Sequence, residues 1–195
     1  MAMHKQVHPK SLYWGNTVIL LSTIDDTDTT NITPISSSWS LSNNIVIGLS
    51  LNSKAIENIE NCPEVVLNVA SDNLSDRIES IAKLTGKDPV PSEKIGFSYC
   101  GNKFALGGFT ELASCTVKPS RIQECLIQVE CLVEHITKRN NFAIVELRAT
   151  HVHADASLLK KDDVIDADLW SPLIYNFRSY HGITSAIGRN FKFDN

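Results

Sequence analysis

The stretch IVIGLSLNSKAIENI, residues 45–59, shows two kinds of hydrophobic pattern in succession. Its first half, Ile45–Leu51, is an aliphatic and β-branched run of the kind found in buried strands. In its second half, Ala55, Ile56 and Ile59 recur at the spacing of one helix face, and polar residues suited to an N-cap stand just before them. The stretch therefore predicts a strand that leads directly into a capped helix.

A serine triplet lies on the N-terminal side of this stretch, within TPISSSWSLS, residues 33–42. Ser36, Ser37 and Ser38 stand where a core strand would carry Val or Ile, because serine has poor strand propensity and little apolar area to bury. We nevertheless predict a strand over Ile32–Ser40, next to the strand that precedes the helix. The three hydroxyls would then lie beside the helix start.

The start of this predicted helix has the features of an anion site. Its unpaired N–H groups and the positive end of its dipole favour a phosphate. Ser50, Asn52 and Ser53 add hydroxyl and amide groups, and Lys54 adds a full positive charge. Because the small side chains of the serine strand would let a flat ring approach the backbone, the two features together are consistent with a flavin site.

The rest of the chain is predicted to be mainly β-structure. Thr17–Ile24 and Glu64–Ala70 are compact apolar runs that predict strands, and residues 71–86 have the cap and C-terminal glycine of a second helix. Residues 87–103 form a long irregular stretch, which can be a lid or a subunit contact. Several strands with few helices favour an antiparallel barrel with peripheral helices.

Two alternating segments, residues 125–136 and 142–154, predict an antiparallel hairpin. In the first of them the apolar side chains are expected to face one way and the polar ones, Gln128, Glu130 and Glu134, the other. In the second, His151, His153 and Asp155 share a face and resemble a metal cluster. Since no third histidine lies near them in sequence, we predict no metal site there.

The composition is that of a soluble globular chain. The 195 residues include 43% hydrophobic and 21% charged residues, and we predict one domain, 1–195, with a barrel core over about 17–160 and a C-terminal extension, 161–195, at an interface. The net charge of −4 argues against nucleic acid, and no window is long and apolar enough for a membrane span. The five cysteines form no CxxC pair, which predicts reduced thiols in a cytoplasmic protein.

Taken in order, several segments of the chain resemble the flavin reductase-like family, the FMN-binding split barrels. The resemblance runs from about Val18 to Arg189. It rests on the segments NITPISSSWSLS, IVIGLSLNSKAIENI, EVVLNVAS, KFALGGFTELASCTVKPSRIQECLIQVECLVEHI, HVHADASLL and LIYNFRSYHGI. It implies a homodimeric six-stranded antiparallel split barrel with FMN at the subunit interface.

The resemblance also implies roles for the serine triplet and for the residues at the predicted helix start. Ser36, Ser37 and Ser38 would contact the isoalloxazine ring through backbone and hydroxyl groups. The ribityl phosphate would lie at Ser50, Leu51, Asn52, Ser53 and Lys54, with Leu51 contributing backbone. Many relatives carry Thr after the basic residue of this turn, whereas this chain has Ala55, so one hydroxyl donor is missing.

Members of this family transfer hydride from NADH or NADPH to flavin, or use bound FMN for electron transfer. We therefore expect an FMN-dependent NAD(P)H oxidoreductase, with a flavoredoxin-like electron carrier served by a redox partner protein, or a flavin-free dimeric binding module, as alternatives. No catalytic residue is predicted, since hydride transfer between stacked rings requires no acid or base. His181 is a candidate for docking the nicotinamide or its phosphates; an ordinary surface role is the alternative.

Overall fold

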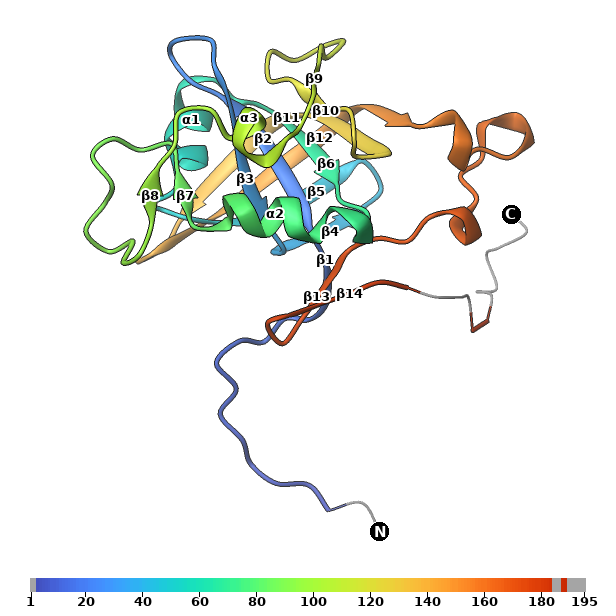
Figure 1. Ribbon diagram of the computed structural model, residues 1–195, viewed down its shortest axis with the longest axis horizontal. Coiled ribbons are helices and arrows are strands. Elements are labelled where there is room, and N and C mark those ends of the chain that lie inside the picture. Colours follow the sequence, from blue (N-terminus) through green and yellow to red (C-terminus); the bar gives the residue numbers. More distant parts are fainter. Residues whose placement is uncertain (1–2, 184–186, 189–195) are drawn as a thin grey trace.

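The computed structural model of the chain describes residues 3–183 and 187–188. Most of them form a single body, and the described N-terminal segment before Tyr13 extends away from it (Figure 1). The strands are β1 (Trp14–Thr17), β2 (Ile19–Ile24), β3 (Thr30–Ile35), β4 (Ser38–Leu41), β5 (Asn44–Ser50), β6 (Glu64–Val69), β7 (Leu84–Thr85), β8 (Ser98–Tyr99), β9 (Glu111–Leu112), β10 (Arg121–Ile122), β11 (Ile127–Lys138), β12 (Phe142–Ala154), β13 (Ile174–Asn176) and β14 (Ser179–His181). The α-helices are α1 (Lys54–Asn61), α2 (Ser75–Ala82) and α3 (Lys103–Gly107), and short 3-10 turns are η1 (Asp72–Leu74), η2 (Ala156–Leu158), η3 (Lys161–Asp163) and η4 (Ala167–Leu169).

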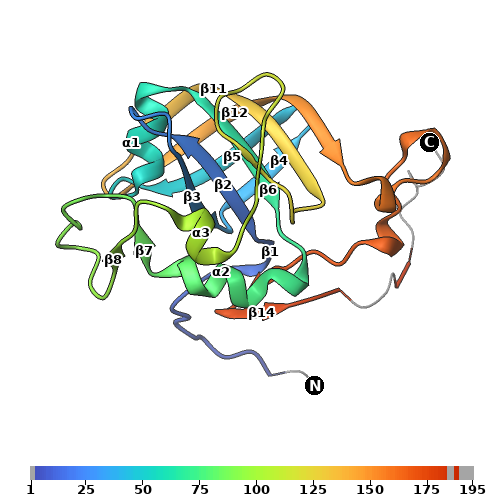
Figure 2. The same cartoon turned by 45° about the horizontal axis from the view of Figure 1, so that its top comes forward.

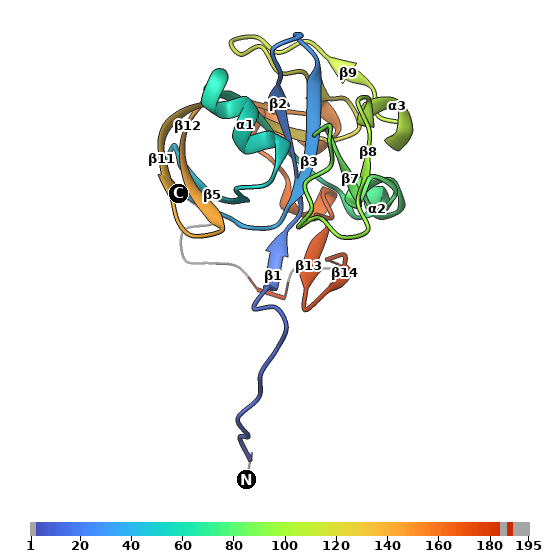
Figure 3. The ribbon, with the colours of Figure 1, turned by 90° about the vertical axis from the view of Figure 1, so that its left-hand side faces the viewer.

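The main sheet has the strand order β3-β2-β6-β11-β12-β5-β4, and all of its neighbours are antiparallel. Its two end strands, β3 and β4, belong to one chain segment, so the ends of the sheet come together (Figure 3). Counted as one strand, this segment makes the barrel six-stranded, as predicted. The fold is mainly β with peripheral helices, and the prediction of a split barrel is confirmed.

The serine segment differs from the single strand predicted over Ile32–Ser40. The strand is interrupted at Ser36 and Ser37, because the segment changes partner there, from β2 on one side to β5 on the other. Across this break the Ser37 carbonyl accepts a hydrogen bond from the Gly48 N–H at 2.9 Å. A Cβ at position 48 would lie 3.1 Å from the Ser37 Cβ, so the glycine permits this close approach.

Two hydrophobic clusters lie on opposite faces of β2, which explains why all six of its residues are buried. Ile19 and Leu21 join the cluster inside the barrel, together with the apolar face of α1. Leu20 joins the second cluster, between the sheet and the helices α2 and α3. A strand buried on both faces reads as a continuous apolar run rather than an alternating one.

The hairpin β11–β12 confirms the predicted pairing, with two register shifts. The two ends of its predicted polar face differ: Glu134 is half-exposed, whereas Gln128 is buried and the Glu130 side chain has no exposed area. The loop after β9 covers Glu130 and donates its backbone N–H groups to the carboxylate. Alternation along a strand shows which side chains share a face, but not which of them a loop from another part of the chain covers.

The second helix is shorter than the predicted range of residues 71–86. It begins with the 3-10 turn η1, and α2 ends at Ala82. Leu84 and Thr85 then form β7, which pairs with β8 in the predicted irregular stretch. The helix ends before Leu84 because Leu84 and Thr85 pair with β8 as a strand.

The N-terminal and C-terminal segments meet in a separate three-stranded sheet of order β1-β13-β14. Figure 2 shows this sheet below the barrel, near α2. Of the predicted extension 161–195, residues 184–186 and 189–195 lie outside the described residues. Among the helices of the described ranges, none combines the length and apolar character needed to cross a bilayer.

Candidate functional site

The candidate site is a cavity of about 660 Å³ beside the serine segment, a volume in the range of small-molecule pockets. Its walls come from the end of β3, from β5 and the start of α1, from α2, β7 and the irregular stretch 87–103, and from the turn between β13 and β14. The lining side chains and backbone belong to Tyr13, Val18, Thr33, Pro34, Ile35, Ser36, Ser37, Gly48, Leu49, Ser50, Ser53, Lys54, Glu79, Ala82, Leu84, Thr85, Glu93, Lys94, Phe97, Lys103, Tyr175, Arg178 and Tyr180.

Five of the residues predicted for the flavin site line this cavity: Ser36, Ser37, Ser50, Ser53 and Lys54. The structure therefore brings the serine segment and the helix start to one opening, although twelve or more residues separate them in sequence. The Ser37 hydroxyl lies 2.5 Å from the hydroxyl of Tyr13, which also borders the cavity.

The other predicted residues lie elsewhere. Ser38 borders a second cavity on the neighbouring surface, and Leu51 and Asn52 form the turn before α1 without lining the first cavity. His181 is exposed on β14 and is also absent from the cavity wall.

The start of α1 is built as the sequence predicts. The Ser53 hydroxyl accepts a hydrogen bond from the Ile56 N–H at 3.2 Å and caps the helix. Lys54 forms an ion pair with Glu57, and Lys87 lies 3.3 Å from the same carboxylate. The hydrogen bond from Lys54 outweighs burial and lowers the pKa of Glu57. Lys54 thus faces the cavity with its charge partly compensated.

Three further cations, which the sequence reading did not single out, border the cavity: Lys94, Lys103 and Arg178. Lys103 is 4% exposed, and its Nζ donates a hydrogen bond to the Ile32 carbonyl at 2.8 Å. Burial, reinforced by the charge of Lys94, lowers the pKa of Lys103 to about 8. The sequence did not predict the burial of Lys103, because α3 has only five residues and is too short for a periodic apolar pattern.

Aromatic rings supply the apolar part of the cavity wall. Tyr175 makes an edge-to-face contact with Tyr13 at 5.5 Å between centroids, and lies 5.8 Å from Tyr180. Phe97 comes from the long irregular stretch, together with Glu93 and Lys94. This stretch therefore forms part of the cavity wall.

The buried ammonium of Lys103 predicts that the stability of the protein without ligand depends on pH. Its folded pKa of about 8 lies below the ordinary 10.5, so between these values the unfolded chain binds more protons. The free energy of unfolding is therefore expected to rise as pH increases from 8 to 10.5. Urea denaturation across this window measures it, and Lys103→Met should flatten the rise; an equal rise in both proteins would contradict the prediction.

Comparison with known proteins identifies the family. The family model described as "Flavin reductase like domain" matches residues 13–184. The chain belongs to the flavin reductase-like family. This confirms the resemblance noted from the sequence segments.

Among its relatives, this flavin reductase-like protein is similar to the uncharacterized protein YdfE of Bacillus subtilis (strain 168), with 42% identity over 193 residues, 96% of this chain and 93% of YdfE. Among solved structures it is similar to flavoredoxin of Desulfovibrio vulgaris (Miyazaki F), with a TM-score of 0.82, 17% identity, and 97% and 98% of the two chains covered. Flavoredoxin from Methanosarcina acetivorans gives a TM-score of 0.80 at 15% identity, covering 98% of this chain and 97% of the other. At these identities the structural likeness shows the fold.

Proposed function

We propose that this chain is an FMN-binding oxidoreductase that transfers hydride or electrons between NADH or NADPH and flavin or a further acceptor. One observation carries the proposal: the serine segment and the start of α1 open into the same cavity, and four cations border it. Membership of the flavin reductase-like family supports flavin as the ligand.

The residues of the cavity fit FMN, which combines a flat ring system with a single phosphate. Lys54 and Lys103 bring positive charge for the phosphate, and Ser50 and Ser53, which carry hydroxyls, also line the cavity. The serine segment presents small side chains and backbone, against which a flat ring can lie. FMN, when bound, supplies the redox chemistry, and the protein positions the ring and excludes water from it.

An electron carrier that takes its electrons from a redox partner protein, without its own reaction with NAD(P)H, is the second candidate. The two solved structures named above are flavoredoxins, which favours this alternative. The two candidates differ in the electron donor that reduces the flavin, so the donor decides between them.

The visible spectrum of the purified full-length protein tests the proposal. We expect FMN to be retained or to bind on titration, and its absorbance to be bleached anaerobically by NADH or NADPH. Bleaching by dithionite or a protein donor alone would identify the electron carrier. A protein that binds no FMN on titration would overturn both and leave a flavin-free binding module.

We also propose that the protein acts as a homodimer through the apolar surface next to the flavin site. A second cavity of about 690 Å³ lies there, and Trp39, which is 60% exposed, borders it together with Val46 and Ile144. Ser37 and Gly48 line both cavities. A second copy seated on this surface would therefore cover the edge of the flavin site, which makes it the occupant we favour.

Trp39→Asp tests this interface. A charge in place of an exposed tryptophan is expected to weaken a dimer at least about tenfold, because interface tryptophans contribute roughly 2 kcal/mol or more. Analytical ultracentrifugation over a concentration series measures the association. Leu106→Asp is the control, since Leu106 is also an exposed apolar residue but belongs to α3. A monomeric wild-type protein, or equal association of all three, would contradict the proposal.

A further inference from the structure

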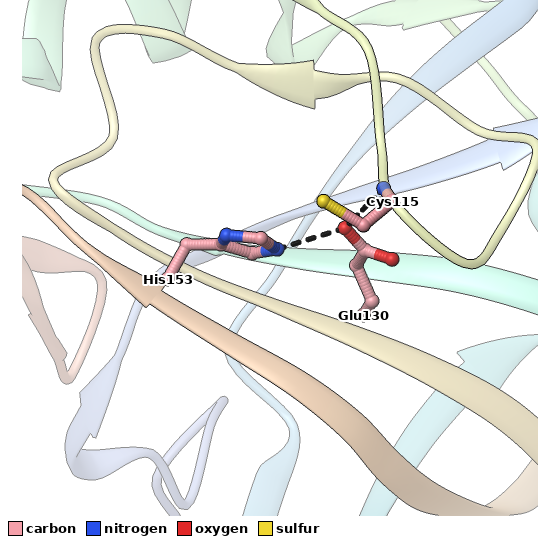
Figure 4. A group of neighbouring side chains, drawn as sticks. All are labelled: Cys115, Glu130 and His153. Carbon is pink, nitrogen blue, oxygen red and sulfur yellow. Dashed lines mark hydrogen bonds and ion pairs between the residues drawn. The ribbon is translucent and has the colours of Figure 1, made fainter.

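We propose that Cys115, Glu130 and His153 form a zinc-binding site outside the flavin cavity. None of the three lines that cavity, and the inference does not depend on the proposed redox function. The three side chains converge from the loop after β9, from β11 and from β12 (Figure 4).

The distances between the candidate ligand atoms are close to those a zinc ion requires. One ligand atom from each residue lies within 4.8 Å of the other two, and the His153 Nε2 is 2.8 Å from the Glu130 Oε1. Zinc binds nitrogen, oxygen and sulfur at about 2.0–2.3 Å, so tetrahedral ligand atoms lie about 3.3–3.8 Å apart, and the Nε2–Oε1 pair must separate by about 0.5 Å to admit the ion. The Cys115 side chain is exposed, so no packing holds its sulfur away from the other two ligand atoms.

The central carboxylate is held in place by the loop. Thr116 donates both its N–H and its hydroxyl to Oε2, each at 2.7 Å, and the Cys115 N–H donates to Oε1 at 2.8 Å. Oε1 keeps a second lone pair, the one now directed at His153. Outer hydrogen bonds of this kind orient a metal ligand and raise its affinity.

The charges and the chemical types of the ligands favour zinc. A Cys115 thiolate and the Glu130 carboxylate together balance the charge of Zn²⁺. On binding, the thiol proton leaves to solvent, and the His153 proton moves from Nε2, where it bonds Glu130, to Nδ1, so that Nε2 can bind the ion. Sulfur with imidazole and carboxylate suits Zn²⁺ better than Mg²⁺ or Ca²⁺, which take oxygen ligands. Because Cys115 is exposed, the ion can enter from solvent, and water can occupy the fourth position.

One positive group opposes the ion: the Arg121 Nε lies 3.9 Å from Oε1. Its guanidinium is held by other acceptors, the Ala113 carbonyl and the Gln128 side chain, at 2.9–3.2 Å. Arg121 can therefore keep these partners when zinc binds. The site differs from the histidine cluster considered in the sequence, because His153 takes part with Cys115 and Glu130.

The test is zinc binding to the full chain after removal of metal with a chelator. We expect isothermal titration calorimetry to show one zinc per chain, with at least about tenfold weaker binding in Cys115→Ser and in His153→Gln, since even outer-shell changes cost 10–100-fold. Cobalt should give a thiolate-to-metal absorption band that Cys115→Ser abolishes. Both positions are partly exposed, so the variants should fold, and circular dichroism checks this.

Matched controls separate this site from others on the chain. Cys62→Ser, His135→Gln and the pair His4→Gln with His8→Gln should bind zinc as the wild type does, since none of these residues contacts the three ligands or Thr116. A wild-type protein that binds no zinc, or binding unchanged by Cys115→Ser and His153→Gln, would overturn the proposal. Loss of zinc in a control variant would overturn it as well, because the ligands would then be different residues.

Discussion

Lys54→Met and Lys103→Met, combined in one chain, are expected to weaken FMN binding by about 10²-fold or more. Each substitution removes a charge-assisted donor from the cavity, and such a hydrogen bond contributes roughly 1.5–3 kcal/mol. Methionine keeps most of the apolar volume of lysine, so packing around α3 should survive. Quenching of flavin fluorescence on titration with protein measures the affinity.

A charge-matched control shows whether the loss of FMN affinity depends on where the lysines lie. Lys83→Met removes the same charge from an exposed position that does not line the cavity, and should bind FMN as the wild type does. Ser53→Ala is a less direct probe, because Ser53 also caps α1. If the double variant and Lys83→Met bind FMN equally well, the phosphate does not lie beside these two lysines.

Glu130→Ala is expected to lower the free energy of unfolding by about 3 kcal/mol or more, measured with a chelator present. The carboxylate accepts hydrogen bonds from two backbone N–H groups, a hydroxyl and His153, and its loss leaves these donors without their acceptor. For a domain of this size the melting temperature should fall by about 6–12 °C. Differential scanning calorimetry measures the change.

Glu134→Ala is the control on the same strand. Its carboxylate is 47% exposed and pairs with Arg148 at the surface, so its loss should cost less than about 1 kcal/mol. Equal melting temperatures for the two variants would show that the buried carboxylate does not anchor the loop. Because chelator is present, this outcome is independent of whether zinc binds.

The local sequence was sufficient to predict the helices and strands whose pattern of apolar and polar side chains depends only on neighbouring residues. The run Ile45–Leu51 and a cap at Asn52 or Ser53 predicted β5 and α1, since both depend on residues within one turn or one strand, and the structure shows Ser53 as the cap. Alternation predicted the hairpin of β11 and β12 for the same reason. The barrel class followed from the number of such strands, and the resemblance of the segments in order identified the family.

Tertiary structure alone decided the electrostatics of both candidate sites. Lys103 borders the cavity and bonds to Ile32, which lies 71 residues away, and Glu130 is buried because a loop 14 or 15 residues earlier folds over it. The break at Ser36 and Ser37 likewise depends on which strands the segment pairs with. Burial of a charged group is set by contacts between distant segments, and propensity and periodicity carry no information about those contacts.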